Sequence, residues 1–450
     1  MAASDAAVCA AQHDPQSEGQ RQKPEMKLLA QRPARCEAPL PPPLDDDLQT
    51  ASDAAPGRGQ PPRPFYSSAQ WTADGTTIIV AGSDNSVSSF VLPADLLQSA
   101  DANRRLEPQA TTRLPEPTQV IVPAPYFSLA EATSQTYLVG CRDHPLHLHH
   151  AFPRHERPNP LGTYKLVRKE TEAYITPASL IWQHPGTHFL CGSANRLDYF
   201  DLSRHGSDGP LLTVPTIPSR RHISKGSGVG MKGTVAALAA SPYDANGGSI
   251  VAAGTWTRWM GLYDLQRTDK VVANWSISHA GDAEAGLGGQ GIVQVVWSPC
   301  GRYLVVNERH TSSLAVYDIR GLGQLLGALS GRESITQQTL ACDVFHGDMS
   351  GNTGFEVWAG SQDGSVLVWE DVGMHCGLAK PSWHWQAHDS PVGSTVLHTS
   401  GSVAATCSGG WEHAPDHLIG GDVGIGRGAH GGSMILDESS LKVWSIGAAG

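Results

Sequence analysis

Residues 189–202 read FLCGSANRLDYFDL, two short apolar runs joined by Ser-Ala-Asn at 193–195. Short runs of this kind, bounded by Gly, Ser and Asn, are typical of β-strands joined by a tight turn. The segment therefore predicts a strand, a turn and a second strand that carries the aromatic residue Phe200. Whether it is an isolated hairpin or one unit of a larger structure depends on whether it recurs.

The same pattern recurs along the chain. A preceding strand that ends in a turn accompanies several copies, as in QWTADG (70–75) and VWSPCG (296–301). The position of Phe200 is occupied in the seven copies by Phe90, His149, Phe200, Tyr263, Tyr317, Trp369 and Trp444. Units of four short strands with loop insertions favour a β-propeller, because one such sheet cannot cover both of its own faces. We expect an all-β fold, a seven-bladed propeller.

The chain divides into an arm and a propeller. Residues 1–64 are rich in Pro, Gln, Asp and Ala, which predicts a largely disordered N-terminal arm. The propeller is expected over 65–447, with a Gly-rich insertion at 408–440. The last blade shows only three strands, so its outer strand must come from elsewhere. The arm segment MKLLAQ (26–31) is the candidate.

Composition limits the classes of function. The formal net charge of −11 means that binding to nucleic acid would require a local basic face. The eight cysteines are scattered without a CxxC pair, which favours a reduced, intracellular protein. No charged-then-apolar signal segment and no apolar run of about 20 residues is present, so we expect no membrane partner. We expect a monomer.

A histidine cluster lies in CRDHPLHLHHAF (141–152). His147 and His149 are two residues apart on one strand face, a spacing that zinc enzymes use. A metal site needs a third and a fourth ligand, and the sequence places none. His149 also occupies the repeat's aromatic position. We therefore predict a packed strand and no metal.

These segments together resemble the telomerase Cajal body protein family of WD-repeat proteins and its fungal splicing-associated relatives. The resemblance covers about residues 65 to 447. It is carried by SSAQWTADG, CRDHPLHLHHAF, FLCGSANRLDYFDL, AAGTWTRWMGLYD and the Gly-rich insertion. His149 and His150 replace the Trp-Asp that the family pattern has there. The resemblance implies binding to small Cajal body RNAs and telomerase RNA, nuclear localisation of those particles, or a link to pre-mRNA splicing.

Enzymatic motifs are weak. SKGSGVGMKGT (224–234) lacks the Gly-Lys-Ser/Thr order of a phosphate loop, and the residues after it read as a strand rather than a helix. GAHGGSM (428–434) resembles a lipase oxyanion segment, but no GxSxG nucleophile elbow exists. Asp45, Asp46 and Asp47 follow a Pro run and read as solvated charges. We expect no enzyme and no cofactor.

Basic and aromatic residues gather in the turns between the second and third strands, which open on one face of WD propellers. Flat side chains among guanidinium groups suit single-stranded RNA, because bases stack on the former and phosphates bind the latter. Loops leading into the third and fourth blades add Arg168, Lys169, His222 and Lys232. The candidate RNA-binding residues are Arg142, His144, Arg196, Arg220, Arg221, Lys225, Trp256, Arg258, Trp259, Arg309 and His310.

Two readings remain open. In the first, the protein is a non-enzymatic RNA-binding scaffold of small nuclear ribonucleoproteins, located in the nucleus or also in the cytoplasm. In the second, it is a protein-interaction platform, associated with the spliceosome or a ubiquitin ligase, without RNA contact. The turn arginines would then brace the blades, with Asp143 and Glu308 as neighbouring acids. Asp84 and Asp363, in the equivalent turns, are expected to form blade-stabilising hydrogen bonds.

Overall fold

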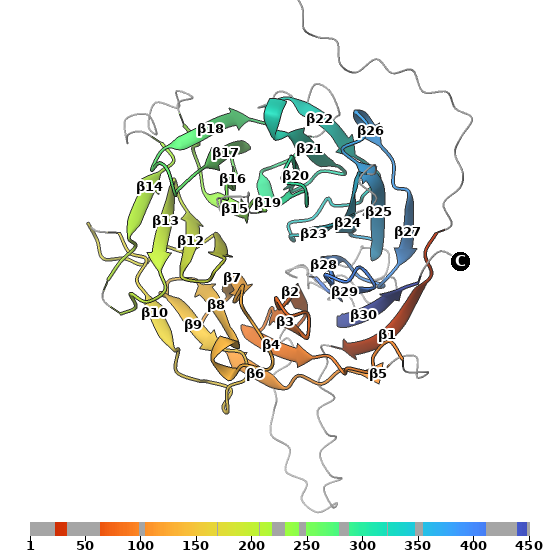
Figure 1. Cartoon of the computed structure of the whole chain (residues 1–450), viewed down its shortest axis with the longest axis horizontal. Helices are drawn as coiled ribbons and strands as arrows, with labels where there is room; N and C mark the ends of the chain where they lie inside the picture. The colour runs from red at the N-terminus through yellow and green to blue at the C-terminus, as the bar shows by residue number, and fades with distance from the viewer. Residues whose placement is uncertain are drawn as a thin grey trace, which may run out of the picture.

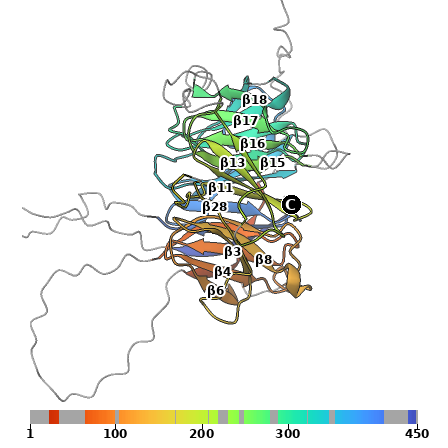
Figure 2. The same ribbon diagram turned by 90° about the vertical axis from the view of Figure 1, so that its left-hand side faces the viewer.

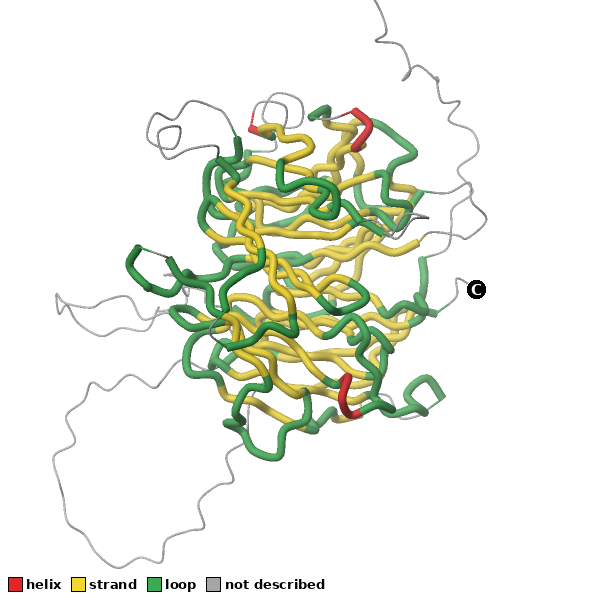
Figure 3. The backbone as a smooth tube through the Cα atoms, turned by 60° about the vertical axis from the view of Figure 1, so that its left-hand side comes forward, coloured by secondary structure: helices red, strands yellow, loops and turns green. Residues whose placement is uncertain are grey.

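Strands pair into seven sheets arranged in a ring around a central axis (Figure 1). The computed structural model describes residues 23–33, 64–98, 104–168, 170–206, 208–217, 230–242, 249–278, 288–321, 323–346, 354–410 and 439–447. Each sheet is one propeller blade, as the repeat predicts. Viewed from the side, the sheets stand next to one another around the ring (Figure 2), and strands make up almost all of the regular structure (Figure 3).

The strands of each blade follow one another from the axis to the rim. Blades 1 to 3 consist of β2 (Tyr66–Trp71), β3 (Thr77–Gly82), β4 (Ser86–Val91) and β6 (Ala110–Arg113); β7 (Thr118–Pro123), β8 (Thr136–Cys141), β9 (Leu146–His150) and β10 (Gly162–Tyr164); and β11 (Ser179–Gln183), β12 (His188–Ser193), β13 (Arg196–Asp201) and β14 (Leu212–Pro215). Blades 4 and 5 consist of β15 (Val235–Ala240), β16 (Val251–Thr255), β17 (Trp259–Tyr263) and β18 (Val271–Ser276); and β19 (Ile292–Trp297), β20 (Tyr303–Glu308), β21 (Leu314–Asp318) and β22 (Leu325–Leu329). Blades 6 and 7 consist of β23 (Cys342–His346), β24 (Phe355–Gly360), β25 (Ser365–Val372) and β27 (Trp383–Gln386); and β28 (Val392–Leu397), β29 (Val403–Ser408), β30 (Ser440–Ile446) and β1 (Met26–Pro33).

Two blades carry a short fifth strand. β5 (Arg104–Arg105) pairs in parallel with β1, and β26 (Gly377–Ala379) pairs in parallel with β22. Two short 3₁₀ helices complete the regular elements of the described residues, η1 (Ala132–Ser134) and η2 (Ile319–Gly321).

The N-terminal arm supplies the outer strand of the last blade. β1 pairs antiparallel with β30 from Met26, opposite Ile446, to Pro33, opposite Ser440. Figure 1 shows β1 and β30 side by side at this point. The segment 26–31 named from the sequence lies within β1. A fragment that begins at residue 65 would therefore lack one strand of the ring, because residues 26–33 of the arm belong to the last blade.

The recurring aromatic position is a buried residue in the second half of each third strand. Phe90, Phe200, Tyr263, Tyr317 and Trp369 are each about 1% exposed. In blade 2, His149 fills the same position and stacks on Tyr137 of β8, with ring centroids 5.8 Å apart. The interpretation of residues 146–150 as the third strand of blade 2 is confirmed.

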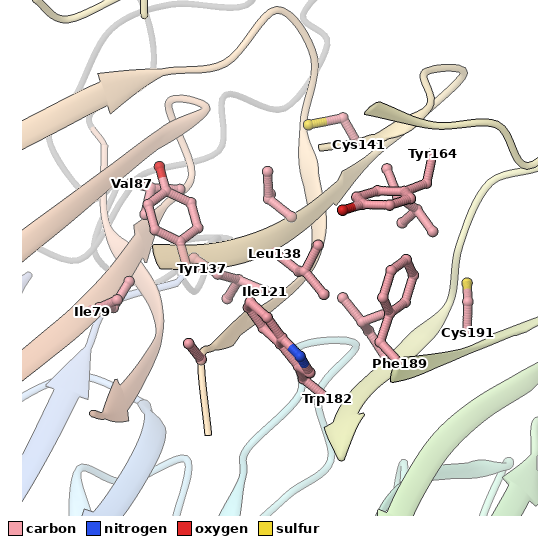
Figure 4. Close-up of a cluster of buried hydrophobic side chains, with 14 of the residues drawn as sticks. Ile79, Val87, Ile121, Tyr137, Leu138, Cys141, Tyr164, Trp182, Phe189 and Cys191 are labelled. Atoms are coloured by element: carbon pink, nitrogen blue, oxygen red, sulfur yellow. The ribbon is translucent and has the colours of Figure 1, made fainter. Parts of the chain in front are cut away.

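The core lies between neighbouring blades. One cluster joins Ile79 of β3, Tyr137 of β8, Trp182 of β11 and Phe189 of β12, and so spans blades 1 to 3 (Figure 4). Phe189 and Phe200 stack with centroids 4.9 Å apart. Because each blade covers the face of the next, burial of apolar surface depends on the whole ring.

The turns that open on the upper face are fixed by short polar side chains. The Asp84 carboxylate accepts hydrogen bonds from the Ser86 amide and hydroxyl at 3.2 and 2.5 Å. Asp363 accepts the same two bonds from Ser365, at 3.0 and 2.7 Å. The turn hydrogen bonds expected of both aspartates are confirmed.

Removal of β1 tests how the ring closes. Deletion of residues 1–22 should leave the melting temperature unchanged, whereas deletion of residues 1–33 should lower it by several degrees or prevent folding. Leu29→Ala, which removes a buried side chain, should cost about 2–4 kcal/mol of unfolding free energy. Thermal melting followed by tryptophan fluorescence measures all three, because β1 packs against Trp444. Equal melting of the two truncated chains would contradict closure by β1.

Candidate functional site at the mouth of the central channel

A cavity of about 780 Å³ lies on the axis of the ring. The innermost strands of the blades line it, largely with small side chains such as Ser67, Ala236 and Gly393. Its charged lining residues are Asp143, Arg168 and Arg309, and all three belong to loops at the upper face. Tyr174 and Trp256 line the cavity from the same face. We call the end of the cavity formed by these five residues the mouth. The described part of the channel therefore concentrates its charged and aromatic groups at one end.

Arg309 and Trp256 form the central pair of the mouth. The guanidinium carbon of Arg309 lies 5.3 Å from the centre of a Trp256 ring, which is a cation–π contact. Trp256 is 46% exposed, so part of its ring surface is open to solvent. Among the described residues no carboxylate pairs with Arg309, and its Nε has no hydrogen-bond partner. The pair thus presents an open aromatic surface beside an uncompensated cation.

Arg258 is held between blades instead. Its guanidinium donates to the Glu308 carboxylate of β20 at 2.7 and 3.1 Å. Both side chains are largely buried, and the backbone of Arg258 has a left-handed φ of 64°. Glu308 is the sequence neighbour of Arg309 but pairs with Arg258 across the blade boundary. The role of this arginine is therefore to join blades 4 and 5.

Arg196 is also neutralised, within blade 3. It donates through Nε to Oδ2 of Asp198 at 2.6 Å and through a second nitrogen to Oδ1. Asp198 is fully buried and also accepts a hydrogen bond from Thr213 at 2.7 Å. Removal of Arg196 would leave a buried carboxylate without its charge partner, so its observed contacts are structural.

Arg142 is the most accessible of the four turn arginines. Its side chain is 68% exposed and lies 3.6 Å from the carboxylate of Asp143. The Nδ1 atom of His144 contacts the carbonyl of Arg142 at 2.9 Å and so shapes the same turn. An exposed pair of this kind contributes little to stability, so no structural role holds Arg142 in place.

The remaining candidates are either partly buried or outside the described residues. Trp259 packs against the apolar cluster between blades 3 and 4. His310 follows Arg309 in a left-handed turn and its Nε2 is buried. Arg220, Arg221 and Lys225 lie outside the described residues, as do Lys169 and His222. The structure thus brings Arg309, Trp256 and Arg168 together, while Arg196 and Arg258 are engaged elsewhere.

Sequence reasoning did not single out Tyr174 at the cavity or the buried Arg332 between blades 5 and 6. Tyr174, 39% exposed, lines the mouth and is the single aromatic residue of its polar loop, a signal that could have been used. Arg332 is 2% exposed and donates to the carbonyls of Gly360 and Leu340 at 2.8 and 2.6 Å. Burial lowers its pKa to about 10. Nothing in its local sequence distinguishes this buried arginine from an exposed one.

The enzymatic motifs find no support in the described residues. Met231 is fully buried, and β15 rather than a helix follows the glycine-rich segment. The residues 224–229, Asp45 to Asp47 and the GAHGGSM segment lie outside the described ranges. No helix in the described part of the chain is long and apolar enough to cross a membrane.

His147 and His149 are packed side chains. Their ring centroids are 5.7 Å apart at a right angle. The described residues contain no group of three or more His, Cys, Asp or Glu side chains that could hold a metal ion. Burial lowers the pKa of both imidazoles, that of His149 to about 4.

The buried His149 should make stability depend on pH. Its pKa is about 4 in the folded chain against 6.5 for an unperturbed histidine, so the unfolded chain binds the proton more readily. The unfolding free energy should fall as pH drops from about 6.5 to 4, by up to about 3 kcal/mol. His149→Phe, which copies blades 1 and 3, should reduce that slope in denaturant melts. An unchanged slope would show that His149 is not the titrating group.

The same histidines give a metal prediction. Purified chain without an affinity tag should contain well under one zinc ion per molecule by elemental analysis, because two imidazoles alone do not complete a zinc site. His147→Ala/His149→Ala should leave that content unchanged. Stoichiometric zinc that disappears in the double variant would overturn the assignment.

The sequence of the chain was compared with those of known proteins. No protein-family model matches the chain. It is 27% identical to Telomerase Cajal body protein 1 of Bos taurus over 77% of this chain and 58% of that protein. It is 24% identical to Guanine nucleotide-binding protein negative regulator 1 of Schizosaccharomyces pombe, over 69% of this chain and 71% of that protein. Protein SWT21 of Vanderwaltozyma polyspora is 22% identical, over 76% of each chain.

The matches to the animal proteins cover most of this chain but less than two thirds of each relative, 58% of the bovine protein and 59% of the Rattus norvegicus one. These matches confirm the resemblance to the telomerase Cajal body proteins that the blade segments indicated. The chain is a seven-bladed β-propeller that is similar in sequence to the telomerase Cajal body proteins and to the fungal SWT21 proteins.

Proposed function

We propose that the protein is a non-enzymatic scaffold of small nuclear ribonucleoproteins that binds single-stranded RNA at the mouth of its central channel. The observation that carries this proposal is the Arg309–Trp256 pair. A base can stack on the open surface of Trp256 while Arg309 supplies positive charge to a neighbouring phosphate. Arg168 and Arg142 extend the positive charge along the same face.

The names of the relatives support the cellular setting of this proposal. "Telomerase Cajal body protein" places the animal relatives with a nuclear body and with telomerase. We extend that setting to this chain and propose a nuclear location with small nuclear RNAs or their proteins, including spliceosome components, as partners. The net charge of −11 makes a local basic site necessary for such binding.

Variants of the two mouth residues should distinguish the contribution of base stacking to RNA affinity from that of charge. Arg309→Gln should lower the salt dependence of RNA affinity by slightly less than one unit of slope, because one phosphate contact is lost. Trp256→Ala should weaken binding by about 1–3 kcal/mol, with little change in slope. A fluorescent oligouridine and an oligoadenosine, titrated at two salt concentrations, measure both effects.

Arg320→Gln is the matched control for this experiment. Arg320 is exposed and follows β21, whereas Arg309 precedes it, so the two lie at opposite ends of one strand. Arg258→Gln tests the alternative that a turn arginine braces the blades. It should lower the melting temperature, because it breaks the ion pair with Glu308. If folded Arg309→Gln and Trp256→Ala proteins bind RNA like wild type, the mouth is not the RNA site.

A second candidate function is supported by a separate observation. Ile335, in the loop between blades 5 and 6, is 76% exposed, and Tyr174 is 39% exposed. Exposed apolar side chains on one face suit a docked peptide as well as a base. Absence of RNA crosslinks in cells would favour this protein-interaction platform.

A further inference from the structure

Three outer strands share a β-bulge at the same place. In β1, β18 and β22 one extra residue is inserted directly after the partner of the buried third-strand aromatic residue. The extra residues are Leu29, Val272 and Leu326. The other four outer strands, β6, β10, β14 and β27, pair without a register shift. A bulge bends a strand and increases its twist, so these three outer edges share a geometry.

Two of the three bulged strands carry the fifth strands of the propeller. β5 pairs in parallel with Ala30 and Gln31, which directly follow the bulge of β1. β26 pairs in parallel with β22 from Gly327, which directly follows its bulge. The first paired residue is small in both cases, and a Cβ at Gly327 would lie 2.6 Å from the carbonyl oxygen of Gly377. A bulge followed by a small residue is therefore the acceptor of a parallel strand in this fold.

β18 has the same bulge and small residue, but no described fifth strand pairs with it. Ala273 follows its bulge, in register with Ala30 and Gly327, and no described strand pairs with its outer edge. Val272 is 57% exposed, whereas the equivalent Leu29 of β1 is 6% exposed. Leu29 clusters with Leu96 and Leu106 from the segment that carries β5. The exposed valine of β18 therefore lacks the aliphatic cover that accompanies a fifth strand.

The chain's own neighbouring loop does not reach this edge as a strand. In both occupied cases the fifth strand comes from the connection between the third and fourth strands of the next blade, at 92–109 and at 373–382. The corresponding connection next to blade 4 is 319–324, which is much shorter. Its described residues contain η2 and Gly323, which packs against Trp275. Among the described residues, no segment of the chain pairs with this edge, which leaves it open to a strand from another protein.

We propose that the outer edge of β18 at 273–275 binds an extended segment of a partner protein as a fifth, parallel strand. Main-chain hydrogen bonds would supply much of the affinity, and an aliphatic residue beside the paired segment would cover Val271 and Val272. This surface is at the rim of the ring (Figure 1), away from the channel mouth. The inference is independent of the proposed RNA binding.

The test uses a library of random twelve-residue peptides displayed on yeast. Peptides are selected on the full chain and counter-selected on Val272→Lys, because a charged residue opposes pairing at an edge. The selected peptides should carry aliphatic residues at alternating positions and bind Val272→Lys at least about tenfold more weakly. They should also slow hydrogen exchange of the amides at 273–275. Leu211→Lys, at an exposed leucine beside the unbulged β14, should bind them like wild type.

Three results would overturn the proposal. Peptides that bind wild type and Val272→Lys equally, or that protect the channel mouth, would place the binding surface elsewhere. Slow exchange at 273–275 in the free monomer would show that the chain covers this edge itself. A dimer in sedimentation that Val272→Lys dissociates would identify the occupant as a second copy of the chain.

Discussion

The antiparallel pairing of β1 with β30 is the interaction on which the ring depends, because it joins residues from the two ends of the chain. A blade exposes two apolar faces unless both neighbours are present, so the last blade must be complete before blades 6 and 1 can be covered. β1 contributes to both sides. Leu28 packs toward Trp444 and the tryptophans of blade 6, while Leu29 joins the cluster of blade 1.

Around the axis, side chains of one inner strand bind the backbone of the next. Ser394 donates to the Ala69 carbonyl, Gln70 to Ile121, Ser179 to Val235 and Gln294 to Cys342, at distances of 2.7 to 3.2 Å. These bonds satisfy carbonyls that no sheet partner can reach, since strands of different blades do not form a ladder. They also require short or amide side chains, which agrees with a channel wall whose inner strands carry no charged lining residue, its charged residues being confined to the loops.

The sequence predicted those features that each repeat encodes locally. The buried position of Phe200 and its equivalents, the turn bonds of Asp84 and Asp363, and the third strand that contains His149 all depend on a few adjacent residues. The partners of the turn arginines depend on contacts across blades. Adjacency suggested that Glu308 neutralises Arg309, whereas the curvature of the ring brings Arg258 to it. The bulges that define the β18 edge are likewise register properties that no single strand reveals.

Neutralisation of Arg258 has a consequence for the neighbouring site. Because Glu308 is engaged with Arg258, it does not compensate the positive charge of Arg309, which lies over the ring of Trp256. If Glu308 paired with Arg309, the charge at the mouth would be compensated and Trp256 would lose its cation. The ion pair between blades 4 and 5 therefore sets the electrostatics of the mouth as well as the fold. A substitution of Arg258 that leaves the chain folded should release Glu308 toward Arg309 and weaken anion binding there, although Arg258 itself does not line the channel.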